Sequence, residues 1–330
     1  MEKYSYVYGP VPSRRMGISL GVSPIPQKVC NYSCIYCQLG RTRQMGNKRE
    51  AFYPITDVLD EVADYLKGKP PMDVITIVGE GEPTLYSSLG ELILGLKNLT
   101  DKPVAVITNG ALMSDREVRD ELGNASLILP SMDAYDERTF KLINRPFGKI
   151  SFDEVYKGIQ TFSKGYSGQL WLETMLIKGI NDDDESLMKL RELLRGIDYD
   201  RLYINTPVRP PAESGVKEPS IERIERAVEL LGGVAINLAA SKGFYSEIRD
   251  DYEAILSIIK RHPMNQHEIG NFLQERNCKD KESVFEKLSR NDQVEKISYK
   301  GFVTYRGIGK QKKVITQHLA RNRKGTDIVY

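Results

Sequence analysis

Short apolar segments alternate with segments of helical periodicity through the middle of the chain, and this alternation limits the possible folds more than any other feature. The apolar run 74–78, for example, precedes a segment at 89–99 in which leucine and isoleucine recur every three or four residues. Alternating strands and helices are typical of βα units that build a parallel sheet. At least six such units fit between residues 74 and 240. The sequence therefore predicts an α/β fold.

Polar and glycine-rich residues follow the predicted strands. Parallel βα sheets place their functional residues at the C-terminal ends of the strands, so we expect one site along that edge of the sheet. The residues at these ends are 79–83, 108–110, 131–133, 179–182 and 206–209.

The first fifty residues lack this alternation of apolar and helical segments. Gly9-Pro10, Pro12, Pro24 and Pro26 interrupt them, and we expect an irregular segment. The N-terminus has no apolar stretch like that of a signal peptide, and no run of about 18 apolar residues occurs in the chain. We therefore expect no transmembrane helix and a cytoplasmic protein. With 40% hydrophobic and 28% charged residues, the composition excludes a wholly disordered chain.

A different pattern begins after residue 250. Three helical segments precede two apolar segments that flank Lys300-Gly301, which predicts a β-hairpin. This order predicts a winged helix-turn-helix over 249–308, after a barrel of residues 1–248 and before a basic tail of residues 309–330. We also expect a helix from Lys312 to Ala320 in the tail. The three helical segments are 252–261, 266–274 and 282–288.

Two features of charge bear on a nucleic-acid partner. The net charge is +2, but residues 1–50 have a net charge of +6 and residues 299–330 one of +7. Basic ends indicate a polyanionic partner, with solvated surface charge as the alternative. The third helix of a nucleic-acid-binding winged helix enters the major groove, whereas other winged helices serve for packing or dimerisation. Basic residues on or beside that helix are Lys279, Lys281, Lys287 and Arg290.

Three of the four cysteines fall within eight residues, Cys30-Asn31-Tyr32-Ser33-Cys34-Ile35-Tyr36-Cys37. Four cysteines in 330 residues are too few for a disulfide scaffold, so the cluster indicates a metal or catalytic site. Three thiolates can hold three irons of a [4Fe–4S] cluster and leave the fourth iron open. A zinc site is the alternative. It needs a fourth ligand, for which the candidates are Cys278, His262 and His267.

The C-x3-C-x2-C spacing, with Tyr36 before the last cysteine, resembles the radical S-adenosylmethionine (radical SAM) superfamily over about residues 5–240. The resemblance implies a partial (β/α)6 barrel and a [4Fe–4S] cluster on Cys30, Cys34 and Cys37. It implies an enzyme that binds S-adenosylmethionine at the open iron and cleaves it reductively, giving a 5′-deoxyadenosyl radical that abstracts hydrogen from a substrate. It also implies an electron donor such as ferredoxin or flavodoxin.

The same resemblance extends to residues that would bind S-adenosylmethionine. Gly79-Glu80-Gly81-Glu82-Pro83 resembles the glycine-glycine-glutamate motif, which implies that Gly81 and Glu82, beside Pro83, hold the methionine ammonium group. Tyr36 matches an aromatic residue near the adenine. Positions that contact the ribose or the methionine moiety are matched by Asn109, Ser131 and Asp133. Each of these could instead be a turn or helix-capping residue, and Glu173 is a weaker candidate.

Residues 8–15, 21–24 and 37–42 resemble a prokaryotic subfamily grouped with the wyosine synthases, which modify a guanosine of transfer RNA. Those enzymes have further cysteines before the main motif, and this chain has none before Cys30. The sequence therefore supports neither a second cluster nor the wyosine reaction, and it assigns no catalytic side chain. Arginines that could contact a phosphate-bearing substrate, or could be surface charge, are Arg14, Arg15, Arg41 and Arg43.

Three functions follow. The first is a radical SAM enzyme that acts on RNA, in particular transfer RNA. The second is a radical SAM enzyme that acts on a peptide or protein. The third is a DNA-binding regulator whose iron–sulfur barrel senses redox state or S-adenosylmethionine.

Overall fold

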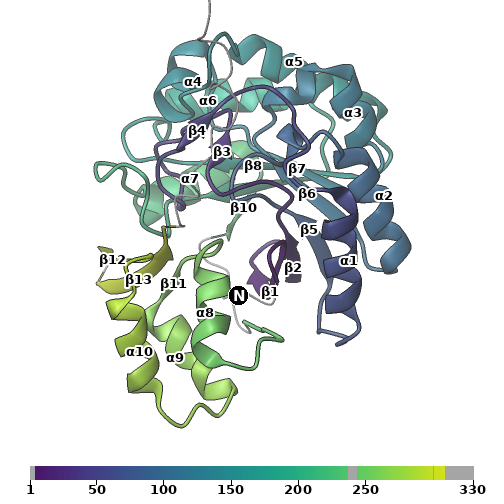
Figure 1. The fold of residues 1–330 in the computed structure, drawn as a ribbon. Helices are drawn as coiled ribbons and strands as arrows, with labels where there is room; N and C mark the ends of the chain where they lie inside the picture. Colours follow the sequence, from purple (N-terminus) through teal and green to yellow (C-terminus); the bar gives the residue numbers. More distant parts are fainter. Residues whose placement is uncertain (1–3, 237–243, 300, 309–330) are drawn as a thin grey trace, which may run out of the picture.

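An eight-stranded sheet forms the larger part of the molecule (Figure 1). The structure is a computed structural model, and it describes residues 4–236, 244–299 and 301–308. The sheet has the order β1-β2-β5-β6-β7-β8-β9-β10, and all neighbours are parallel except β1 and β2. Its strands are β1 (Val7–Ser13), β2 (Gly17–Val22), β5 (Val74–Ile77), β6 (Val104–Thr108), β7 (Leu127–Pro130), β8 (Gln169–Met175), β9 (Arg201–Asn205) and β10 (Val234–Ala235).

Six strands in succession, from β2 to β9 along the sheet, are each followed by a helix, which confirms the predicted α/β fold with its parallel sheet. The helix α4 (Glu137–Ile143) is an addition between β7 and its main helix. Leu89, Leu92, Ile93 and Leu96 of α2 are all buried, because their spacing places them on one face of the helix. The six helices are α1 (Ile55–Leu66), α2 (Leu89–Leu99), α3 (Arg116–Leu122), α5 (Phe152–Gly165), α6 (Asp184–Leu194) and α7 (Ile221–Leu231).

The expectation of an irregular N-terminal segment is wrong, because β1 and β2 form an antiparallel hairpin there. Pro10 and Pro12 lie in β1, which is the edge strand of the sheet and is the kind of strand that tolerates proline. The cysteine segment follows β2 and includes β3 (Val29–Cys30), which pairs with β4 (Gln44–Met45). The first βα unit therefore begins at residue 17 rather than residue 74.

A second group of elements follows the barrel, and residues 249–308 are called the C-terminal unit below. The predicted helices and hairpin are all present, and a short strand, β11, adds to the hairpin in the order β11-β13-β12. The identification of this unit as a winged helix-turn-helix stays a prediction, and the predicted tail helix lies outside the described residues. The elements are α8 (Asp251–Ile259), β11 (Met264–Asn265), α9 (Gln266–Glu275), α10 (Lys281–Arg290), β12 (Val294–Tyr299) and β13 (Phe302–Gly307).

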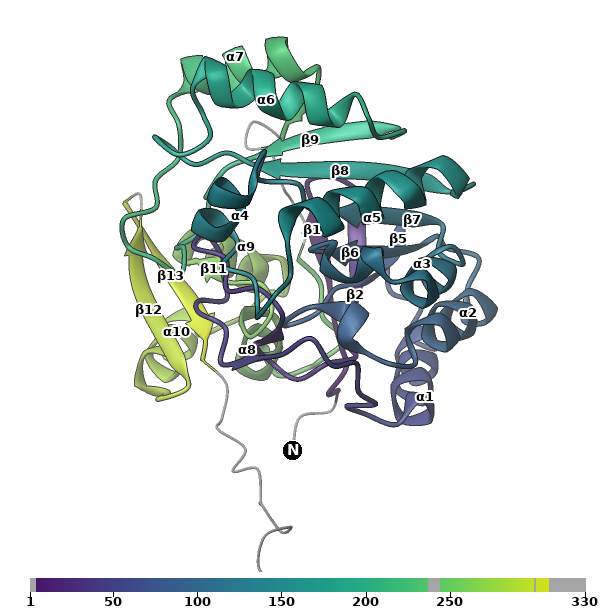
Figure 2. The same ribbon diagram turned by 90° about the horizontal axis from the view of Figure 1, so that it is seen from above.

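The C-terminal unit shares its apolar core with the barrel. Tyr8 and Val11 of β1 are buried in one cluster with Ile255, Phe272 and Tyr305. Figures 1 and 2 show α8 near β1, on the opposite side of the molecule from α2 and α3. The unit thus covers the edge strand, which would otherwise expose unpaired backbone groups. None of the helices in the described residues is long and apolar enough to cross a membrane.

Replacing Val11 with alanine should lower the free energy of unfolding by about 2 kcal/mol, since two buried carbon atoms are lost from the shared core. Chemical denaturation followed by circular dichroism measures this change, and we expect barrel and C-terminal unit to unfold in one transition. Val234→Ala is the matched control, because Val234 is 58% exposed on β10. Equal stability of the two variants would contradict a shared core.

Candidate active site

A cavity of about 360 Å³ opens where the strands end, and it is called the main cavity below. Cys30, Cys34 and Cys37 all line it. So do residues of the predicted strand-end sets 79–83 and 206–209, together with Arg261 and His262 of the C-terminal unit. The sequence thus predicted two of its walls, whereas the wall from the C-terminal unit was not predicted.

The three cysteine thiols are free, and amide groups donate hydrogen bonds to two of them. Asn109 Nδ2 lies 3.7 Å from Cys30 Sγ, and Asn144 Nδ2 lies 3.6 Å from Cys34 Sγ. The backbone N–H of Tyr32 also donates to Cys30 Sγ at 3.4 Å. These N–H donors would stabilise the negative charge of a metal-binding thiolate.

The electrostatic surroundings of the thiols depend on whether a metal is bound. Burial raises the pKa of Cys30, Cys34 and Cys37, which favours neutral thiols as long as no metal ion binds them. The cations of Lys28 and Arg306 act in the opposite sense on Cys37. Lys28 is only 8% exposed, and within the described residues its ammonium group makes no hydrogen bond or ion pair. A negatively charged metal–thiolate centre would balance this buried charge.

The segment 79–83 packs directly against the cysteine segment. A Cβ atom at position 81 would collide with the carbonyl oxygen of Val29, so only glycine allows this close approach. The backbone N–H of Glu82 donates to the same carbonyl at 3.0 Å. Gly79, Glu80 and Gly81 line the main cavity, while Pro83 is buried and is not among its lining residues.

Glu82 is 2% exposed and is not among the residues that line the main cavity. Its Oε1 accepts from the hydroxyl groups of Thr84 and Thr108, both at 2.6 Å, and from the Thr84 N–H at 3.0 Å. Its Oε2 accepts from the Asn109 N–H at 2.8 Å. The side chain therefore ties the end of β5 to the end of β6. Burial raises the pKa of Glu82, and these hydrogen bonds oppose that effect.

Tyr36 and Asp133, two of the residues predicted to bind the cofactor, are joined by a hydrogen bond. The Tyr36 hydroxyl donates to Asp133 Oδ2 at 2.6 Å, and Asn144 Nδ2 donates to the same oxygen at 2.8 Å. The Met175 N–H donates to Oδ1 at 2.9 Å. One buried carboxylate thus connects the cysteine segment, α4 and β8.

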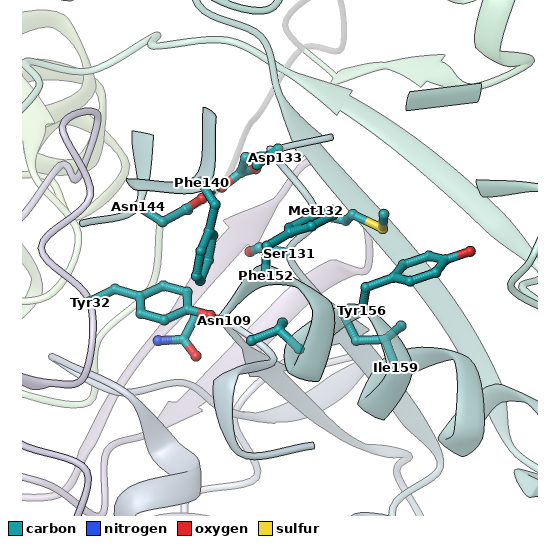
Figure 3. Close-up of a pocket in the computed structure, with 12 residues that line it drawn as sticks. Tyr32, Asn109, Ser131, Met132, Asp133, Phe140, Asn144, Phe152, Tyr156 and Ile159 are labelled. Atoms are coloured by element: carbon teal, nitrogen blue, oxygen red, sulfur yellow. Dashed lines mark hydrogen bonds between the residues drawn. The ribbon is translucent and has the colours of Figure 1, made fainter. Parts of the chain in front are cut away.

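Asn109, Ser131 and Asp133 line a second cavity of about 20 Å³, which Tyr32 shares with the main cavity (Figure 3). Asn109 Nδ2 also donates to Asn31 Oδ1 at 2.7 Å, so Asn109 supports the cysteine segment. The strand end 179–182 lines neither cavity. Instead, the buried Asn181 Nδ2 donates to the Asp133 carbonyl at 2.9 Å and supports Asp133 from behind.

Sequence reasoning missed several residues of the main cavity. Lys28 precedes the first cysteine by two positions, and that proximity was an available signal. Arg261 is more than 220 residues from Cys37 and carried no such signal. The sequence offered His262 only as a candidate zinc ligand, and His262 lines the cavity together with the three cysteines. Arg261 forms an ion pair with Glu80 at 3.3 Å, which connects the C-terminal unit to the glycine-rich segment. The predicted weaker candidate Glu173 lines the cavity, where it pairs with Arg15.

The family model described as the radical SAM superfamily matches residues 25–191, which include the cysteine segment and the strand ends 79–83, 108–110 and 131–133. The chain belongs to the radical SAM superfamily. Members of this superfamily are enzymes that bind a [4Fe–4S] cluster and S-adenosylmethionine, and these are the cofactors of this radical SAM enzyme.

Relatives of this radical SAM enzyme cover almost its whole length. It is 35% identical over 310 residues to a UPF0026 protein of Methanocaldococcus jannaschii, with 90% of this chain and 94% of that protein covered. It is 34% identical over 310 residues, or 92% of its length, to a protein of Brachyspira hyodysenteriae named GTPase Obg, and it spans 45% of that protein. A radical SAM methyltransferase of Sphaerobacter thermophilus has a similar fold, with a TM-score of 0.51, 19% identity and coverage of 68% of this chain and 69% of the other.

The residues present fit both cofactors of the superfamily. Three free thiols line one cavity, and two of them accept amide N–H donors, which suits the thiolate ligands of an iron–sulfur cluster. The cavity continues from these thiols past Gly81 and Tyr36, which gives a second ligand space beside the cluster. Cys278 lies in the C-terminal unit against its apolar core and is not among the residues that line the cavity.

Proposed function

We propose that Cys30, Cys34 and Cys37 hold the [4Fe–4S] cluster and that S-adenosylmethionine binds beside them in the main cavity. When bound, the reduced cluster and S-adenosylmethionine supply a 5′-deoxyadenosyl radical that abstracts a hydrogen atom from the substrate. The observation that carries this proposal is the placement of the three free thiols on one cavity at the strand ends. An electron donor such as ferredoxin or flavodoxin would reduce the cluster.

The other site residues position these ligands in our proposal. Gly81 leaves backbone groups open toward the methionine moiety, beside Glu82 and Pro83. Tyr36 lies against the adenine, and its orientation is fixed by the bond to Asp133. The remaining predicted contacts to the ribose or methionine moiety, Asn109 and Ser131, line the small cavity. The amide donors on Cys30 and Cys34 would stabilise the thiolates and so tune the potential of the cluster.

For the substrate we propose RNA, and in particular transfer RNA. Support comes from the basic N-terminal segment and from the cationic side chains Arg14, Arg15 and Arg209 that line the main cavity. The proposed winged helix would bring a second contact through α10. There Lys281, Lys287 and Arg290 alternate with Glu282 and Glu286, so we assign the stronger attraction to the cavity.

The anaerobic enzyme, reconstituted with iron and sulfide, should form 5′-deoxyadenosine from S-adenosylmethionine when dithionite is added, and bulk transfer RNA should accelerate this reaction. If phosphate contacts drive binding, RNA affinity should fall about tenfold or more between 50 and 200 mM salt for two contacted phosphates. Chromatographic assay of 5′-deoxyadenosine and fluorescence anisotropy measure the two effects.

The alternatives predict other results. Acceleration by peptides but not by RNA would replace the RNA proposal with a peptide substrate. A fully cluster-loaded protein that forms no 5′-deoxyadenosine and binds a specific DNA would contradict the enzyme proposal in favour of the regulator.

A further inference from the structure

One region of the main cavity contains hydrogen-bond donors that have no acceptor among the residues that the structure describes. The Arg14 guanidinium lines the cavity and makes no hydrogen bond or ion pair with any described residue. Arg15 Nε and Thr206 Oγ1 are buried without a hydrogen-bond partner, and both residues also line the cavity. Thr206 is only 1% exposed. Buried donors of this kind are costly unless a ligand accepts from them.

These donors lie close together although they come from distant parts of the chain. Arg14 and Arg15 form the turn between β1 and β2, and Thr206 follows β9. Arg15 Nη1 donates to Glu173, and Asn205 Nδ2, from the residue before Thr206, donates to Glu173 Oε1 at 3.2 Å. Glu173 is therefore the common neighbour that places Arg15 near the Thr206 end of the cavity.

The C-terminal unit completes this region with His262. Arg209 Nη2 lies 2.8 Å from His262 Nε2 and 3.1 Å from a Glu268 oxygen. Arg14, Arg15, Arg209 and His262 all line the main cavity. Burial lowers the pKa of His262, and the charges of Arg209, Arg14 and Arg15 lower it further. His262 is thus neutral at physiological pH.

The charges in this region do not cancel. Arg15 is paired with Glu173 and Arg209 with Glu268, whereas the charge of Arg14 is left over. Burial lowers the pKa of Arg14, as does the nearby Arg209, but a guanidinium group stays charged at neutral pH. The region therefore has one positive charge in excess and several donors free, which suits a monoanion with more than one acceptor oxygen.

We propose that Arg14, Arg15 and Thr206 form a subsite for a phosphodiester group of the substrate RNA. This inference rests on the proposed function and places a phosphodiester group of the substrate in the same cavity as the three cysteines. A phosphodiester carries a single negative charge, and its two non-bridging oxygens can accept from Arg14 on one side and from Arg15 and Thr206 on the other. Arg14 supplies the positive charge that balances the phosphodiester, and Arg15 and Thr206 donate hydrogen bonds that orient it.

The test uses the cluster-loaded full chain with saturating S-adenosylmethionine, titrated calorimetrically with inorganic phosphate and separately with acetate at constant ionic strength. Wild type should bind phosphate more tightly than acetate. Arg14→Gln should weaken phosphate binding about tenfold or more, because a charge-assisted hydrogen bond is lost. Arg14→Lys, which keeps the charge, should weaken it less. Arg116→Gln is the matched control, since Arg116 is 87% exposed on α3.

Phosphate binding by Arg14→Gln equal to wild type would overturn the subsite. Tighter binding of acetate than of phosphate would overturn the phosphodiester assignment in favour of a peptide carboxylate. Thermal unfolding of each variant shows whether Arg14→Gln folds, and Arg14→Lys carries the comparison if it does not. Formation of 5′-deoxyadenosine by the same wild-type preparation separates the two proposals: with that activity present and phosphate binding insensitive to Arg14, only the subsite fails.

Discussion

Replacing Cys34 with alanine should abolish formation of 5′-deoxyadenosine, whereas Cys278→Ala should leave it unchanged. Cys34 is the middle cysteine of the segment, and its Sγ accepts from Asn144 Nδ2 at the junction between α4 and the main cavity. Losing one of the three proposed ligands would leave two thiolates for the cluster, which is too few to hold a [4Fe–4S] centre against loss of iron. The effect should therefore be loss of cofactor rather than slower turnover.

Iron and sulfide content per chain, together with the visible absorbance of the cluster, separates these two explanations. We expect both to collapse in Cys34→Ala and to match wild type in Cys278→Ala, because Cys278 packs against the core of the C-terminal unit. Similar thermal unfolding of the two metal-free variants would show that the alanine itself does not disrupt the fold. Retention of a full cluster and of activity by Cys34→Ala would contradict the assignment of Cys34 as a cluster ligand.

Much of the barrel could be predicted because its signals are local. The spacing of apolar residues predicts helices at 89–99 and 184–194, and α2 and α6 have these bounds. An amphipathic helix packed on a sheet shows its buried face in every turn, so its pattern can be recognised without knowledge of its neighbours. The cysteine segment is also local, since one loop carries all three thiols.

The parts that failed depend on contacts between distant segments. The prolines of β1 suggest a loop. The strand forms nevertheless at the edge of the sheet, because its residues Tyr8 and Val11 are buried against the C-terminal unit. His262 reaches the main cavity only because that unit docks there. The apolar pattern within one segment does not indicate which distant segment will pack against it, so the core that Tyr8 and Val11 share with the C-terminal unit could not be predicted.

The C-terminal unit also contacts the segments on either side of the cysteines. Arg306 Nη1 donates to the carbonyl of Gln38 at 3.1 Å, and the Gln27 side chain donates to the carbonyl of Lys260 at 3.1 Å. With the Arg261–Glu80 ion pair, these contacts attach the unit to both sides of the cysteine segment. Substrate specificity should therefore depend on the C-terminal unit even if α10 never contacts RNA.

Replacing Glu82 should also have a large effect, and the structure and the family resemblance predict different consequences for stability and cofactor affinity. If the carboxylate acts mainly on S-adenosylmethionine, Glu82→Ala should lose cofactor affinity and keep its stability. The geometry predicts a loss of stability as well, because the side chains of Thr84 and Thr108 and the N–H of Asn109 would lose their acceptor inside the protein. Each orphaned buried donor costs about 1–3 kcal/mol, so we expect a loss of at least about 3 kcal/mol.

Glu82→Gln sharpens the comparison. The amide keeps one acceptor oxygen but turns an NH₂ group toward a donor that the carboxylate satisfies, either the Asn109 N–H or the threonine hydroxyls. Glu82→Gln should therefore lie between wild type and Glu82→Ala in the free energy of unfolding. Glu91→Ala, at an exposed position of α2, should match wild type.

Chemical denaturation and equilibrium dialysis with S-adenosylmethionine measure stability and affinity separately. Wild-type stability in Glu82→Ala together with lost cofactor binding would show that Glu82 leaves its four donors and contacts the cofactor directly. Parallel losses would show that it acts through the two strand ends, by holding the Gly81 backbone and Asn109 in place beside the cysteines.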